Sequence, residues 1–375
     1  MLTAPPPPPA IEQPAAYQLS YGVVAGTAAP GTRRVIVRVG SRTLADKPLA
    51  QRHFQLRVAL PPSEAAVEVI TVNASGRRSR ATVPHVLGAG GAASPVLRAP
   101  LDDALLQRTV HQLAQRFGST SGIYVQDLTT GAGAAWNARA TFPAASSLKL
   151  AIAVTALARL EGTPLPGSTL DRLLRTMLTY SDNAAANSTE AYFGGSTSGG
   201  SALVNSLMRS VGLVDTEMYG GYELDAFGEP RRSPAGSGAI PLRVDFQPSW
   251  GIGKKSSAYD LASLMRGVWL ASGGRGRLHT AQPGFTPTDG RYLLYLLAHV
   301  RDPGKIDREV GKLAGVRVLH KAGWINVARH DNGIVLWQGG AIVVTVMTYR
   351  SGGAGTASDV LAGKVASAAL RRFRE

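Results

Sequence analysis

The stretch FPAASSLK at residues 142–149, which continues as LAIAV to residue 154, contains a turn followed by a helix start. Pro143 and the small residues after it indicate the turn, and apolar residues from Leu148 onward recur with a helical period. Ser146 and Lys149 are three residues apart, so we expect both side chains on one face of the first helical turn. The sequence therefore predicts a serine hydroxyl beside a lysine amine at a helix N-terminus.

This pairing of residue types is suited to nucleophilic catalysis. A serine hydroxyl becomes a good nucleophile when a neighbouring base removes its proton. A lysine amine can be that base when its pKa is lowered, and the positive end of a helix disfavours an ammonium ion. The same helix end offers free backbone N–H groups to a developing oxyanion. Taken alone, the stretch also fits an N-capping serine followed by a solvated lysine.

Composition narrows the class of protein. The chain has 375 residues, 44% of them hydrophobic, which predicts two domains with a sizeable core. No apolar run approaches ~18 residues, so we expect no membrane span. The net charge of +15 favours anionic partners such as anionic cell-envelope polymers. Because the basic residues are scattered and accompany no nucleic-acid-binding signature, we expect no nucleic-acid partner.

The sequence does not contain the residues that several other kinds of active site require. The sequence has no cysteine, which excludes disulfides, thiolate metal sites and a cysteine nucleophile. It contains no zinc-binding histidine cluster, and we expect no metal or other cofactor. The G-x-S-x-G elbow of Ser-His-Asp hydrolases is absent as well. Residues 1–20 show no secretory signal.

Changes in composition and in the pattern of apolar and turn residues along the chain predict four segments. Residues 1–15 form a Pro-rich tail that we expect to be disordered, and residues 87–100 form a Gly/Ala linker. Between them, residues 16–86 alternate short β-rich runs with turn residues, which predicts a small all-β sandwich. Its candidate strands are 19–24, 34–39, 54–60, 67–72 and 80–83.

Residues 101–375 have an α/β (α+β) pattern with strands grouped at both ends. This order predicts an antiparallel sheet made from the two ends and faced by a helical subdomain. The candidate strands are 123–128, 134–137, 316–320, 333–337 and 341–349. Besides the helix that starts at Ser146, the candidate helices are 102–117, 170–179, 184–192, 202–211, 258–270 and 357–373.

Two further motifs carry compatible chemistry. Ser181-Asp182-Asn183 directly follows a predicted helix, where a serine in a tight turn can relay a proton and an asparagine can bind both substrate and lysine. The run Lys321-Ala322-Gly323-Trp324 ends a predicted strand. There a glycine permits close approach of a substrate to the backbone, and the lysine supplies positive charge.

The ordered set S-x-x-K, S-D-N, K-x-G resembles the signature of class A serine β-lactamases and penicillin-binding proteins. The resemblance covers roughly residues 101–375. Further similar runs are 181–187 (SDNAAAN), 212–216 (GLVDT), 257–262 (SAYDLA) and 331–335 (DNGIV). The spacing of the short strands at 16–86 is similar to that of bacterial immunoglobulin-like modules.

The resemblance implies roles for the reacting groups. Ser146 would attack a carbonyl and form an acyl-enzyme, with Lys149 as the base. Ser181 would pass a proton to the departing nitrogen, assisted by the charge of Lys321. No metal or cofactor is implied.

It also implies roles in substrate binding. The backbone N–H groups of Ser146 and Trp324 would form the oxyanion hole, and Asn183 would orient the lysine and the substrate amide. Ala322 and Gly323 would lie along the bound substrate.

The sequence departs from the family pattern at two places. Ala322 replaces a threonine whose hydroxyl grips the substrate carboxylate, a loss of ~1–3 kcal/mol if nothing replaces it. Arg329 is a candidate substitute, on proximity in sequence. The omega-loop pattern E-x-x-L-N is absent after Thr216. Glu223 is our candidate for the base that activates the hydrolytic water, the alternative being an exposed loop carboxylate.

The resemblance therefore implies a hydrolase that opens β-lactam rings or related amides. The alternatives are a D-Ala-D-Ala-type acyl enzyme with slow deacylation, and a non-catalytic cell-envelope binding protein. The implied partners are a small-molecule β-lactam or a peptidoglycan peptide. An extracytoplasmic or secreted location is expected because such substrates lie outside the cytoplasm.

Overall fold

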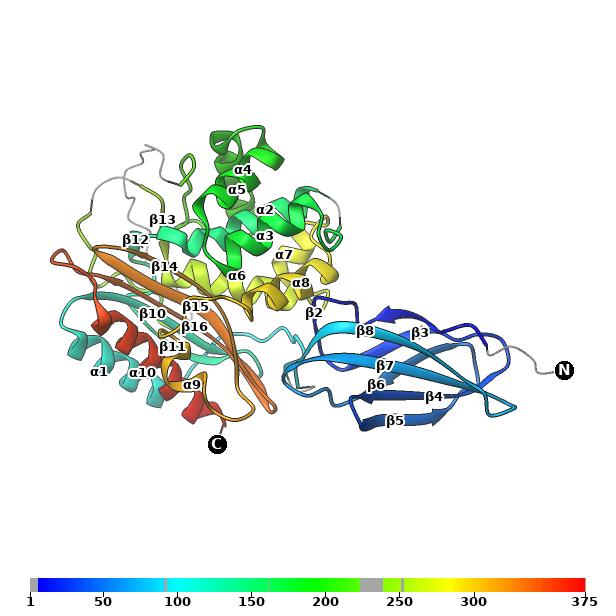
Figure 1. Ribbon diagram of the computed structural model, residues 1–375. Helices are drawn as coiled ribbons and strands as arrows, with labels where there is room; N and C mark the ends of the chain where they lie inside the picture. Colours follow the sequence, from blue (N-terminus) through cyan, green and yellow to red (C-terminus); the bar gives the residue numbers. More distant parts are fainter. Residues whose placement is uncertain (1–5, 91–92, 161, 223–238, 251–252, 375) are drawn as a thin grey trace. The chain divides into compact units, whose positions relative to one another are not determined.

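Two units make up the chain in the computed structural model (Figure 1). The first contains residues 1–94 with 337–339, and the second contains residues 95–336 with 340–375. The residues described are 6–90, 93–160, 162–222, 239–250 and 253–374.

The first unit consists of two β-sheets that share one apolar core. Val35 and Val37 of β4, Phe54 of β6 and Val69 of β7 are buried in the same cluster. The strand orders are β1-β3-β6 and β2-β8-β7-β4-β5, and every neighbouring pair is antiparallel except β2 and β8. The strands are β1 (Ala10–Gln13), β2 (Gln18–Ser20), β3 (Val23–Thr27), β4 (Thr32–Val39), β5 (Arg42–Pro48), β6 (His53–Arg57), β7 (Glu64–Asn73) and β8 (Arg78–Gly88).

Three details differ from the sequence-based expectation for this unit. The disordered tail expected at 1–15 is wrong over Ala10–Gln13, because β1 pairs with β3. The strand expected at 19–24 divides at Gly22, where φ is +80° and a Cβ would lie 2.1 Å from the carbonyl oxygen of Val58. The mostly exposed edge strand β5 was not expected, because it lacks buried alternation. The immunoglobulin-like character of the unit stays a prediction.

The second unit contains a six-stranded sheet of order β14-β15-β16-β10-β11-β9. Strands from the two ends of the unit meet where β16 pairs antiparallel with β10. The predicted antiparallel sheet is thereby confirmed, with β9 and β11 as a short parallel pair. The strands are β9 (Leu101–Asp102), β10 (Thr120–Asp127), β11 (Ala132–Trp136), β14 (Arg317–Ile325), β15 (Ala328–Trp337) and β16 (Gly340–Tyr349).

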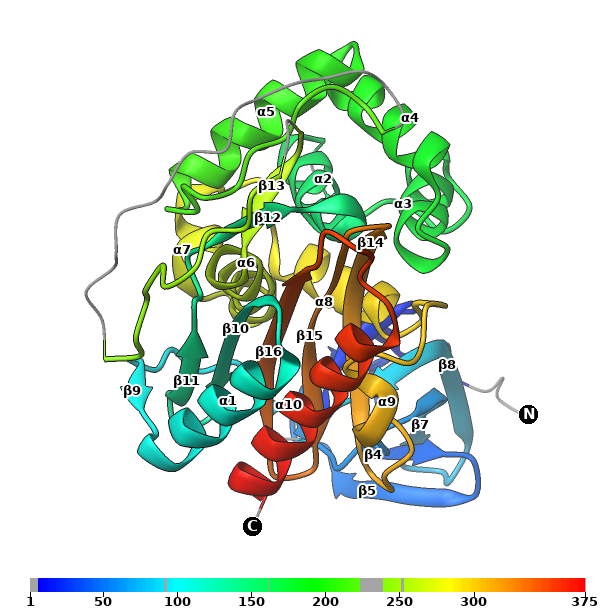
Figure 2. The ribbon, with the colours of Figure 1, turned by 90° about the vertical axis from the view of Figure 1, so that its left-hand side faces the viewer.

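Helices cover both faces of this sheet. Figures 1 and 2 show α1, α9 and α10 against one face and α6 and α8 against the other. Central strand β16 is consequently buried along almost its whole length, which explains its continuous apolar sequence. These helices are α1 (Ala104–Phe117), α6 (Ala258–Ala271), α8 (Pro287–Leu297), α9 (Asp307–Val310) and α10 (Thr356–Arg374).

A helical group on the α6 and α8 side of the sheet completes the unit (Figure 2). It contains α2 (Lys149–Arg159), α3 (Thr169–Thr179), α4 (Asn183–Gly194), α5 (Thr197–Ser210) and α7 (Gly276–Ala281). The short strands β12 (Thr141–Pro143) and β13 (Lys255–Ser257) pair beside it. Among the described residues, none of the helices has the length and apolar character needed to cross a membrane.

Candidate active site

Ser146 lies in a 3₁₀ turn, η2 (Ala145–Leu148), rather than in the α-helical start that the sequence predicted. Lys149 is the first residue of α2, and its N–H donates to the carbonyl of Ser146. Residues three apart eclipse one another in 3₁₀ geometry, so the turn stacks Lys149 beside Ser146. Ser146 is half-buried and Lys149 is fully buried.

A hydrogen bond from a buried histidine holds the backbone just before this turn. Nε2 of His330 donates to the carbonyl of Pro143 at 2.7 Å, while its Nδ1 accepts the N–H of Thr348 at 3.2 Å. Burial lowers the pKa of His330 to about 4, so the imidazole is neutral and structural. Ala145 then takes φ +48°, a left-handed conformation that costs energy for a residue with a side chain.

The amine of Lys149 points at the S-D-N motif. It donates to Oδ1 of Asn183 at 2.5 Å and to the carbonyl of Ser181, and it lies 3.5 Å from Oγ of Ser181. Asp182 caps α4 by accepting the N–H of Ala185 at 2.6 Å. The cap fixes where α4 begins, and therefore where Asn183 meets the lysine.

Lys321 approaches the same serine from the sheet. Its Nζ donates to Oγ of Ser181 at 2.9 Å and to the carbonyl of Ala322 at 2.7 Å. Burial lowers the pKa of Lys321 to about 8, against the opposing effect of Asp302 and Asp331. The Ser181 hydroxyl thus lies between two lysine amines.

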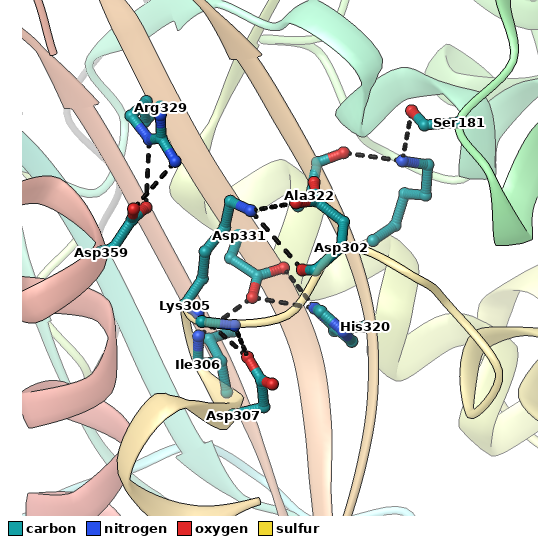
Figure 3. Close-up of polar contacts among 12 residues, drawn as sticks. Ser181, Asp302, Lys305, Ile306, Asp307, His320, Ala322, Arg329, Asp331 and Asp359 are labelled. Atoms are coloured by element: carbon teal, nitrogen blue, oxygen red, sulfur yellow. Dashed lines mark hydrogen bonds and ion pairs between the residues drawn. The ribbon is translucent and has the colours of Figure 1, made fainter. Parts of the chain in front are cut away.

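Figure 3 shows a cluster of charged groups that includes Asp302, Lys305 and Asp331, and these three act on the pKa of Lys321. Nδ1 of His320 lies 2.9 Å from Asp331, and Lys305 donates to Asp302 at 2.5 Å. Burial opposes a charge on His320, but the Asp331 carboxylate outweighs it and raises the pKa of the imidazole. The positive charge of Lys321 is therefore balanced by carboxylates that do not contact Ser181.

Gly323 packs directly against the turn η2 that contains Ser146. A Cβ at this position would lie 2.6 Å from the backbone nitrogen of Ser147 and 2.9 Å from that of Ser146. The next residue, Trp324, is 58% exposed. A glycine is therefore required where β14 meets η2.

The two departures from the family pattern have different outcomes. Ala322 is buried and contributes its carbonyl to Lys321, whereas Arg329 makes a bidentate ion pair with Asp359 at 3.1 and 2.8 Å. Arg329, the candidate substitute for the missing threonine, is therefore paired with a carboxylate of α10. Glu223 lies outside the described residues.

Sequence reasoning missed one residue of the site. Tyr222 is buried, and its ring centroid lies 4.5 Å from Nζ of Lys149. Asn187, one helical turn after Asn183, binds the backbone of Tyr222 over a separation of 35 residues, so no local pattern predicts this contact. In the described part of the chain, no group of three or more His, Asp or Glu side chains could hold a metal ion.

Comparison with known proteins gives a family and a fold. The profile of the β-lactamase enzyme family (Beta-lactamase2) matches residues 105–168 and 163–373. No curated protein sequence matches the chain.

Solved structures share the fold at low sequence identity. The structure of PBP-A is 21% identical with a TM-score of 0.54, covering 74% of this chain and 99% of its own. An ancestral class A β-lactamase is 21% identical with a TM-score of 0.53, covering 72% of this chain and 100% of its own. The β-lactamase from Sphaerobacter thermophilus is 19% identical with a TM-score of 0.53, covering 72% and 97%.

Proposed function

Because the chain belongs to the β-lactamase enzyme family, we propose that it is a serine hydrolase that opens β-lactam rings or related amides through an acyl-enzyme on Ser146. The observation that carries this proposal is the Ser181 hydroxyl, which lies 3.5 Å from the Lys149 amine and 2.9 Å from the Lys321 amine. The nucleophile turn lies against Gly323 of the same strand as Lys321.

The acylation step uses these groups in order. The neutral amine of Lys149 takes the proton of Ser146, and Oγ of Ser146 forms a bond to the substrate carbonyl carbon. When the tetrahedral intermediate collapses, the C–N bond breaks and the Ser181 hydroxyl gives its proton to the departing nitrogen. The proton held by Lys149 then returns to Ser181 across their 3.5 Å separation. Lys321 stabilises the negative charge that develops at Ser181.

The backbone N–H groups of Ser146 and Trp324 are our proposed oxyanion donors. Asn183, whose Oδ1 holds Lys149, would donate from its Nδ2 to the substrate amide. Ala322 offers no hydroxyl to a substrate carboxylate. We therefore expect carboxylate-bearing β-lactams to bind ~1–3 kcal/mol more weakly than with a threonine there.

The fate of the acyl-enzyme depends on a base for the attacking water. Glu223 is our candidate for that base. A mutant of the structural neighbour PBP-A has been solved as an acyl-enzyme complex with penicillin G, which shows that this fold can hold such an adduct. We propose that the protein acts outside the cytoplasm, where its net charge of +15 would favour anionic envelope polymers.

A fluorescent penicillin and a chromogenic cephalosporin test the proposal together. Turnover of the cephalosporin supports the hydrolase. A persistent fluorescent adduct without turnover indicates a peptidase-like acyl enzyme with slow deacylation. Neither signal, from a folded protein, would contradict acyl chemistry and favour a binding protein.

A further inference from the structure

Tyr222 contacts the nucleophile turn and the lysine base at once. Its hydroxyl donates to the carbonyl of Ala145 at 3.1 Å, immediately before Ser146. Its ring centroid lies 4.5 Å from Nζ of Lys149, so the ring forms one wall of the site around this amine. Burial raises the pKa of Tyr222 well above its ordinary value, so the phenol keeps its proton and remains a hydrogen-bond donor.

Helix α4 fixes the position of this tyrosine. Asn187 accepts the N–H of Tyr222 at 2.6 Å and donates to its carbonyl at 3.0 Å. Asn183 and Asn187 are four residues apart and lie on one face of α4. Asn183 holds the Lys149 amine directly, so the same helix face positions both the lysine and the ring beside it.

Lys254 also contacts Tyr222 and the residue before it. Its Nζ donates to the carbonyl of Gly221 at 2.6 Å and lies 5.0 Å from the centroid of the Tyr222 ring. Its own carbonyl accepts the N–H of Ala144 at 2.8 Å. The two residues before Ser146 are therefore both held by hydrogen bonds, Ala144 to Lys254 and Ala145 to Tyr222.

We propose that Tyr222 is a positioning residue for acyl transfer, which holds Ala145 in the conformation that presents Ser146 and keeps the Lys149 amine directed at Asn183 and Ser181. This inference rests on the proposed function, because it concerns the same nucleophile and base. Without the hydroxyl, the left-handed Ala145 loses the bond that compensates for its strain. Without the ring, the long Lys149 side chain loses one wall of its site.

Two variants separate the hydroxyl from the ring. We expect Tyr222→Phe to slow acylation by penicillin on the order of tenfold, since it removes one hydrogen bond and leaves the ring. Tyr222→Leu should slow acylation by roughly a further tenfold, because it also removes the aromatic wall that keeps the Lys149 amine directed at Asn183 and Ser181. The rate constant is measured by stopped-flow with a fluorescent penicillin, and stability by thermal unfolding.

Tyr292→Phe is the matched control, because the Tyr292 hydroxyl makes a similar buried bond to Asp171 at 2.7 Å between α8 and α3. It should lower stability and leave the acylation rate unchanged. Equal rates for Tyr222→Phe and Tyr292→Phe would overturn the inference.

A fluorophosphonate, which reports on serine nucleophilicity without a β-lactam, distinguishes the two proposals. Labelling of Ser146 by the fluorophosphonate but not by penicillin would contradict the proposed substrate class and leave the inference about Tyr222 standing. In that case the rate of fluorophosphonate labelling should still decrease from wild type to Tyr222→Phe to Tyr222→Leu. Absence of both labels would overturn the proposed function and the inference together.

Discussion

Nζ of Lys321 lies 2.9 Å from Oγ of Ser181, although 140 residues separate them in the sequence. The lysine comes from β14 of the sheet, and the serine comes from the turn before α4. Their hydrogen bond joins the sheet to the helical group at the point where Lys149 also arrives. The proton relay that we propose through Ser181 would therefore depend on the packing of both parts of the second unit.

The charge of Lys321 should limit activity at alkaline pH. Its pKa is about 8, so the ammonium form is present below that pH and is lost as the pH rises through it. Asp302 raises this pKa, and Asp302→Asn should therefore move the alkaline limb of the acylation rate to lower pH. Stopped-flow acylation rates from pH 6 to about 10 provide the measurement.

Asp359→Asn serves as the comparison, because Asp359 pairs with Arg329 and not with Lys321. Its alkaline limb should match that of the wild type. A limb that stays in place in Asp302→Asn would show that Lys321 does not set the alkaline decline.

Gly323→Ala should damage the site through the backbone. The added methyl would meet the nitrogen of Ser147 at 2.6 Å and that of Ser146 at 2.9 Å, so η2 must move away from β14. A displacement of this size should reduce acylation on the order of 10²-fold and destabilise the fold by ~1–3 kcal/mol. Gly352→Ala, which would meet no atom within 4 Å, should retain both rate and stability. Full activity of Gly323→Ala would refute the close contact.

Glu190 should make stability depend on pH. Burial raises its pKa from 4.5 to about 7, and Oε2 has no partner among the described residues. Ser201 Oγ lies 2.8 Å from both Oε1 and the carbonyl of Gly220, so a protonated Glu190 can donate to Ser201 while Ser201 donates to Gly220.

Between pH 4.5 and about 7, Glu190 is ionised in the unfolded chain but still protonated in the folded chain. Stability should therefore fall as the pH rises through this window, by up to roughly 3 kcal/mol. In Glu190→Gln that fall should be smaller by this amount, because the buried Asp260, whose pKa burial raises to about 8, still contributes to it. The exposed Glu309→Gln should preserve the whole fall. Urea unfolding at pH 4.5, 6 and 8 measures the difference, and an unchanged pH dependence in Glu190→Gln would contradict the assignment.

Much of the second unit could be predicted because its signals are local. Three local patterns each predict one kind of element without reference to distant residues. They are the apolar period after Leu148, the S-D-N turn and the β-rich runs at the two ends of the unit. The family motifs also predict that Ser146, Lys149, Ser181 and Lys321 share one site. The structure brings the amines of Lys149 and Lys321 to the hydroxyl of Ser181.

The remaining features depend on tertiary contacts. The turn η2 packs against Gly323, and the chain just before it is held by His330; both residues lie far along the sequence. The role that we propose for Tyr222 depends on a ring in contact with Lys149 and Lys254, and no local pattern predicts these contacts. Helix α8 was missed although Thr286 and Asp289 form a capping box, a signal that the sequence does contain.

The most direct test of the proposed chemistry is the intact mass of the protein after exposure to penicillin G. We predict one added penicilloyl mass on the wild type, localised to Ser146 by peptide mapping, and none on Ser146→Ala. Ser147→Ala, which changes the neighbouring serine, should still gain the mass. An adduct that persists in Ser146→Ala, or a fluorophosphonate-reactive wild type that never gains the penicilloyl mass, would contradict acyl transfer from a β-lactam to this serine.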